Sequence, residues 1–134
     1  MNNILIGIGL ALAIALLARL VGFDRERSFY PVVMIIIASY YGLFAVLGGS
    51  QQAFIAEAVP MTAFMLAAVI GFRKNLWIVV AALAGHGVFD FFHGELIQNP
   101  GVPTWWPAFC GAYDIVAACY LAWLLKRGQP PAVA

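Results

Sequence analysis

Apolar residues fill five long stretches of the chain, and short connections rich in polar residues, glycine or proline separate them. The stretches cover residues 4–21, 31–47, 53–72, 76–93 and 107–125. Each is close to the roughly 20 residues that an α-helix needs to cross the hydrocarbon core of a bilayer. The pattern therefore predicts an all-α fold, an integral membrane bundle of about five transmembrane helices that occupies residues 1–134 as a single domain.

Basic residues are confined to alternate ends of these stretches. They lie near the end of the first stretch, in the first connection, in the third connection or directly after the fifth stretch: Arg19, Arg25, Arg27, Arg73, Lys74, Lys126 and Arg127. Because positively charged connections stay in the cytoplasm, we expect the N-terminus outside, the C-terminus in the cytoplasm, and the chain in an inner or plasma membrane. No basic residue precedes the first stretch, so we expect a retained helix there rather than a signal peptide.

The composition excludes several classes of protein. Hydrophobic residues make up 64% of the chain and charged residues 10%, whereas about a quarter of a soluble domain is charged. The expected surroundings are therefore the lipid bilayer. A net charge of +1, with no basic tract longer than a pair, excludes binding to nucleic acid. Cys110 and Cys119 would face opposite sides of one helix, so they are not expected to pair.

Five ionisable residues interrupt the apolar stretches: Glu57, His86, Asp90, His93 and Asp114. An ionisable group inside hydrocarbon costs about 2–4 kcal/mol even on insertion scales, so each needs a partner or a function. In the predicted orientation all five lie in the outer half of the membrane, on three helices. This shared depth predicts one polar pocket that opens outward.

Three of these residues share one helix face. At 100° per residue, His86, Asp90 and His93 project from a narrow stripe over two turns, so they can act on one object. Other residues one turn away or at a similar depth are secondary candidates for the pocket: Ser39, Tyr40, Tyr41, Met61 and Cys110.

Three chemistries fit such a pocket, and the sequence leaves them open. The metal ligands would be Glu57, His86, Asp90, His93 and Asp114, and they suit a divalent ion such as zinc, manganese or iron. Without a metal, the catalytic acids and bases would be Glu57, His86, Asp90 and Asp114. The same groups could relay protons or ions, or they could only hydrogen-bond across the bundle and fix the helix register.

The residue types His86, Asp90 and His93 are similar to those that hold zinc in membrane hydrolases of the alkaline ceramidase type. That resemblance implies a zinc site. Those enzymes have seven helices, a different motif order and a third histidine ligand, whereas this chain has only two histidines. The chain is therefore not assigned to that family.

Two classes of function and a structural alternative follow. The first is a small multi-pass membrane enzyme or ligand-binding protein that acts on a hydrophobic, lipid-soluble molecule. The second is a proton- or metal-ion-coupled transporter or channel, which at this chain length would need a homo-oligomer to build a pathway. The third is an accessory structural subunit. Apart from the connection at residues 73–75, residues 64–83 carry almost no polar groups on the inner side, which favours a one-sided pocket over a continuous path.

Overall fold

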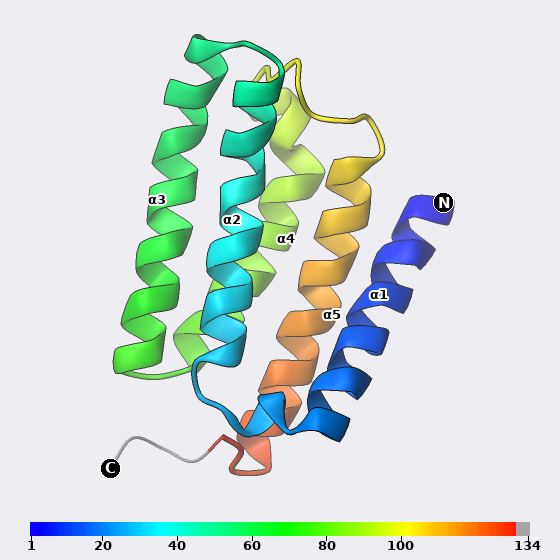
Figure 1. Cartoon of the computed structure of the whole chain (residues 1–134), viewed down its shortest axis with the longest axis vertical. Helices are drawn as coiled ribbons and strands as arrows, with labels where there is room; N and C mark the ends of the chain where they lie inside the picture. The colour runs from blue at the N-terminus through cyan, green and yellow to red at the C-terminus, as the bar shows by residue number, and fades with distance from the viewer. Residues whose placement is uncertain (131–134) are drawn as a thin grey trace.

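The computed structural model describes residues 1–130, so the last four residues of the expected domain lie outside the described part. Figure 1 shows a bundle of long helices. The elements are α1 (Asn2–Val21), a short 3-10 helix η1 (Phe23–Arg25), α2 (Phe29–Leu47), α3 (Gln51–Arg73), α4 (Trp77–Leu96) and α5 (Trp106–Lys126). All five α-helices are long and apolar enough to cross a membrane. The predicted all-α bundle is confirmed to that extent, and no helix end differs from its prediction by more than three residues.

Local signals explain where the helices begin and end. The side-chain oxygen of Ser50 accepts a hydrogen bond from the backbone N–H of Ala53 and caps the start of α3. Gly22 ends α1 with a positive φ of 93°, a conformation that glycine adopts without steric cost. Arg27 donates from Nε to the carbonyl of Phe72 at 2.7 Å, which satisfies a free carbonyl at the end of α3.

The helices pack as two joined groups. α5 packs against α1 on one side and α4 on the other, while α2 packs against α3. α4 also contacts α3 and α2 and so joins the two groups. In Figure 1, α1 and α2 diverge from η1, and α5 lies between them. The helices that carry the polar residues therefore meet around α4.

The close contact of α1 with α5 depends on small side chains. Gly7, Ala11, Ala15 and Ala18 form the buried stripe of α1. A methyl group at Gly7 would overlap the backbone carbonyl of Phe109 in α5. Small residues four apart let helix backbones approach closely in lipid, where no hydrophobic effect drives helices together.

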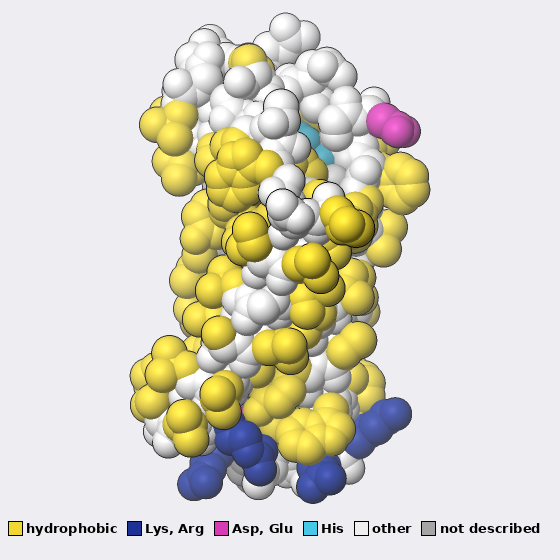
Figure 2. Space-filling view, turned by 90° about the vertical axis from the view of Figure 1, so that its right-hand side faces the viewer, with side chains coloured by type: hydrophobic (Ala, Val, Ile, Leu, Met, Phe, Trp, Pro, Cys, Tyr) yellow, Lys and Arg dark blue, Asp and Glu magenta, His cyan; other side chains and the backbone are white. Residues whose placement is uncertain are grey.

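Charge is distributed unevenly along the bundle. Figure 2 shows Lys and Arg side chains gathered at one end and apolar side chains covering the lateral surface. The basic end is the one at which α1, α3 and α5 finish, so the N-terminus begins toward the opposite end.

Candidate metal centre

Two pairs of residues, each one helical turn apart, bring together between α4 and α5 four side chains that could hold a metal ion. His86 and Asp90 come from α4, and Cys110 and Asp114 come from α5. We call these four residues the four-donor cluster. Two glycines let the helices approach at this level, because a methyl group at Gly87 or Gly111 would lie 3.0 Å from the carbonyl oxygen of the other.

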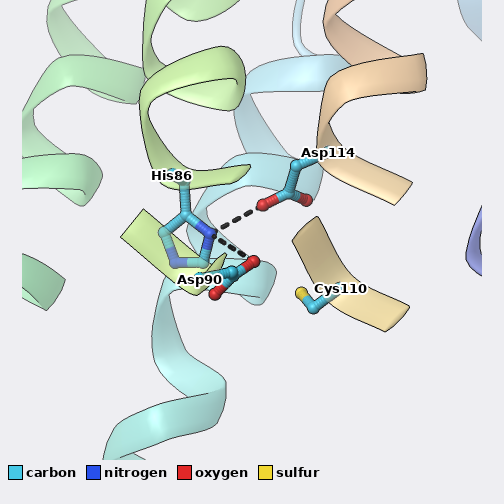
Figure 3. A group of neighbouring side chains, drawn as sticks. All are labelled: His86, Asp90, Cys110 and Asp114. Carbon is cyan, nitrogen blue, oxygen red and sulfur yellow. Dashed lines mark hydrogen bonds and ion pairs between the residues drawn. The ribbon is translucent and has the colours of Figure 1, made fainter. Parts of the chain in front are cut away.

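The imidazole of His86 faces the carboxylates of both Asp90 and Asp114 (Figure 3). Its Nδ1 is hydrogen-bonded to Oδ2 of Asp114 at 2.7 Å and lies 3.4 Å from Oδ2 of Asp90. The sulfur of Cys110 points toward the carboxylate of Asp90. One ligand atom from each of the four residues lies within 4.8 Å of the others. The four residues could therefore hold a metal ion.

The four-donor cluster is shut off from the surface and is not fully hydrogen-bonded. Asp90 and Asp114 are 0% exposed, and His86 and Cys110 are also buried. Oδ2 of Asp90 and Oδ1 of Asp114 have no hydrogen-bond partner among the described residues. Two buried carboxyl groups face one imidazole, and when both are ionised the site carries negative charge that a cation would neutralise.

A second polar group lies nearer the end opposite the basic residues. Nε2 of His93 in α4 lies 2.5 Å from Oε1 of Glu57 in α3, and both side chains are buried. The amide of Asn99, in the connection between α4 and α5, donates to the same Glu57 oxygen at 3.0 Å and to the backbone carbonyl of Tyr41 at 3.0 Å. We call His93, Glu57 and Asn99 the capping group, because Asn99 brings the connection over the buried pair.

Tyr41 of α2 joins the two groups. Its hydroxyl donates to Oδ1 of Asp90 at 2.6 Å. Its ring stacks on that of His93, with ring centres 3.8 Å apart and planes at 4°. Tyr41 thus forms the boundary between the four-donor cluster and the capping group.

The structure divides the single five-residue ligand set that the sequence suggests. His86, Asp90 and Asp114 lie together with Cys110, whereas His93 and Glu57 pair with each other and lie outside the four-donor cluster. Tyr41 joins the polar network, while Ser39 bonds its own helix at the carbonyl of Ile36. All five predicted residues are buried among the residues that the structure describes, so the outward-opening pocket that the sequence predicts is not seen at them. Their catalytic and metal-binding roles stay predictions.

Sequence reasoning did not single out Asn99 as a site residue. Asn99 lies in a connection, and its contact with Glu57 depends on how that connection folds back over α2. The neighbouring Pro100-Gly101 sequence is the available signal for such a turn. At Gly101 a methyl group would overlap the carbonyl of Phe44, so this connection lies directly against the end of α2.

The donor set is chemically suited to a first-row metal. An imidazole nitrogen, a thiolate and two carboxylates are ligands that zinc accepts. In a tetrahedral zinc site, bonds of roughly 2.0–2.3 Å place the ligand atoms about 3.3–3.8 Å apart. The widest spacing here, 4.8 Å, would therefore close by about 1 Å around a metal.

Known proteins give no further guidance, since the chain matches no protein-family model, no curated protein and no solved structure. Any function must be argued from the site itself.

Proposed function

We propose that this chain is a multi-pass membrane protein that binds a divalent transition metal, best matched by zinc, in the four-donor cluster and acts on a lipid-soluble molecule. The observation that carries the proposal is the pair of unpartnered carboxylate oxygens on Asp90 and Asp114 beside a thiol and an imidazole. Helix register alone would not require four metal-binding groups to converge with acceptors left free, because buried polar groups are normally hydrogen-bonded.

A bound cation would stabilise the buried acidic groups of the four-donor cluster. An unpaired buried charge in a low-dielectric interior is strongly unfavourable. His86 is the one basic group in the four-donor cluster and faces both Asp90 and Asp114. A divalent ion would balance both carboxylates, and a third negative ligand would be available from Cys110.

A metal-free acid–base site is the second candidate. The row of polar contacts from Tyr41 through Asp90 and His86 to Asp114 could move a proton with no metal present: Tyr41–Asp90 and His86–Asp114 are hydrogen bonds, and Asp90 and His86 lie 3.4 Å apart. A transport path receives less support, because the buried residues of α4 toward the basic end are Val79, Ala82 and Leu83.

We propose further that the basic end of the bundle faces the cytoplasm. The positive-inside rule then places the N-terminus outside, and the polar residues lie between the membrane centre and the outer surface. An inner or plasma membrane is the proposed location.

The test is elemental analysis of detergent-purified protein from cells supplied with zinc, manganese and iron. We expect near-stoichiometric metal in the wild type and loss of nearly all of it in His86→Ala. Asp114→Asn should also lose the metal. Because asparagine keeps the shape of the aspartate side chain, this variant distinguishes loss of a ligand from unfolding, which could otherwise explain the result for His86→Ala.

The matched control is His93→Ala, which removes a buried histidine from the same helix but leaves the four-donor cluster intact. This control should retain metal. Absence of metal from the wild type would contradict the proposal and leave the acid–base candidate, and equal metal in all variants would place the site elsewhere.

A further inference from the structure

A cavity of about 340 Å³ lies at the basic end of the bundle. Three segments of the chain line it: the connection before α2, the connection from α3 to the start of α4, and the end of α5 with the residues after it. We call it the basic-end cavity. None of its lining residues belongs to the four-donor cluster or to the capping group, so the proposed function does not account for it. They include the polar Arg27, Lys74 and Asn75 and the apolar Leu76, Trp77 and Leu125.

The guanidinium of Arg27 is held in place at this cavity. Its Nε donates to the carbonyl of Phe72 at 2.7 Å, and its Nη2 donates to the carbonyl of Gly71 at 3.4 Å. These two bonds use only part of the N–H donors of the group, and neutral carbonyl acceptors leave its positive charge in place. Arg27 is half-buried and lines the cavity. It therefore offers a cation in a fixed position with further N–H donors available.

The positive charge at this end has no acidic partner within the described part of the chain. Each ion pair found in residues 1–130 involves a histidine, and none involves Lys or Arg. Seven basic residues lie at this end against two acidic ones, Asp24 and Glu26, which leaves a net charge of +5. Asp24 is buried and accepts a hydrogen bond from the hydroxyl of Tyr120, and neither acidic residue lines the cavity. An anion from outside the chain would complement this charge.

The position and the apolar residues of the cavity favour a lipid over a free anion. Helices long enough to cross a membrane finish or begin here, so the cavity lies at the level of lipid headgroups. Trp77, which is 44% exposed, begins α4 at this level, and tryptophan is typical of the membrane–water interface. A free phosphate would leave Trp77 and Leu125 facing water, whereas a lipid would cover them with its glycerol and acyl chains.

We propose that the basic-end cavity binds one anionic glycerophospholipid whose phosphate is its only charge, and that Arg27 and Lys74 hold this phosphate. Phosphatidylglycerol has that chemistry. Phosphatidylethanolamine carries the same phosphate together with an ammonium group, which the net positive charge of this end repels. The proposal does not rest on the metal centre, and it requires only that the basic end lie at a bilayer surface.

The experiment titrates purified full-length protein in detergent with phosphatidylglycerol or phosphatidylethanolamine of identical acyl chains. Native mass spectrometry counts the lipids bound and gives the Kd of the first one. The wild type should bind one phosphatidylglycerol at least about tenfold more tightly than phosphatidylethanolamine, because a charge-assisted hydrogen bond to an unopposed anion contributes at least that factor. Inorganic phosphate added in excess should not displace the lipid, since it cannot cover the apolar part of the cavity.

Two variants test the residues that hold the phosphate, and each has a matched control. Arg27→Gln should weaken phosphatidylglycerol binding about tenfold or more. Its control Arg25→Gln removes an exposed arginine outside the cavity and should leave the Kd within about twofold. Because Arg27 also bonds the end of α3, Lys74→Gln repeats the test at an exposed residue with less risk to folding, and about three- to tenfold weakening is expected. Lys126→Gln, exposed and outside the cavity, is its control.

The outcomes separate a lipid site from general attraction between opposite charges. Preference for phosphatidylglycerol that both cavity variants weaken and both controls retain supports the proposal. Equal binding of the two lipids, or equal weakening in a cavity variant and its control, overturns it, because the charge of the whole end would then account for binding. Displacement of the lipid by inorganic phosphate overturns the choice of a lipid and makes the cavity a site for a free anion. Lys74→Gln that binds like the wild type overturns the shared role of Arg27 and Lys74.

Discussion

Tyr41 uses three parts of one residue to hold the polar interior together. Its hydroxyl donates to Asp90, its ring stacks on His93, and its carbonyl accepts from Asn99. Through these three contacts, Tyr41 fixes the positions of residues in both the four-donor cluster and the capping group.

Removal of the Tyr41 hydroxyl should destabilise the protein without changing its packing. In Tyr41→Phe the stack on His93 remains, but Oδ1 of Asp90 loses its donor. We expect the free energy of unfolding to fall by about 1–3 kcal/mol, the cost of leaving a buried acceptor unpaired. Titration with sodium dodecyl sulfate, monitored by circular dichroism, measures this free energy of unfolding. The control Tyr40→Phe alters the neighbouring half-buried tyrosine, and an equal loss there would contradict the argument.

The residue types of the polar interior could be predicted from the sequence, but their grouping could not. His86 and His93 project from almost the same side of α4, so periodicity cannot separate them. Their different partners depend on neighbouring helices: α5 presents Asp114 to His86, and α3 presents Glu57 to His93. Those contacts follow from helix packing, which spacing within one helix does not contain.

Among the elements, α1 is attached mainly through its contact with α5. Its length and apolar character are evident in the sequence, and the four-residue spacing of Gly7, Ala11 and Ala15 indicates a packing face. The partner helix is not evident, because α2 and α3 also carry small residues at that spacing.

A pair of glycine substitutions tests the α1–α5 contact. In Gly7→Ala the new methyl group would overlap the carbonyl of Phe109, whereas at Gly9 a methyl group meets no atom within 4 Å. We expect Gly7→Ala to lower the free energy of unfolding by about 1–3 kcal/mol through overpacking. Gly9→Ala should be neutral or stabilise the helix by up to about 1 kcal/mol. Equal effects in the same detergent titration would mean that α1 does not pack as described.

Over the whole molecule, the seven basic residues mark one end and the polar network lies toward the other. This asymmetry was predictable, because hydrophobic runs set the number of spans and basic residues mark alternate connections. The closure of the polar interior was not predictable, because it depends on how the connection that contains Asn99 folds over α3 and α2.

The proposed orientation can be tested with two exposed glutamines at opposite ends, Gln98 and Gln129. Each is replaced by cysteine in a Cys119→Ser background, where the remaining Cys110 is buried. A membrane-impermeant maleimide should label Gln98→Cys in intact cells and Gln129→Cys only after lysis. The reverse pattern would place the basic end outside.

The central claim is that the four-donor cluster holds a metal through Cys110, and X-ray absorption of the metal-loaded protein tests it most directly. The account predicts one sulfur at about 2.3 Å together with nitrogen or oxygen ligands at about 2.0–2.2 Å for zinc. The signal of the sulfur ligand should disappear in Cys110→Ser. It should remain in Cys119→Ser, because Cys119 is exposed and lies outside the four-donor cluster. A metal shell without sulfur in the wild type, or one unchanged in Cys110→Ser, would contradict the account.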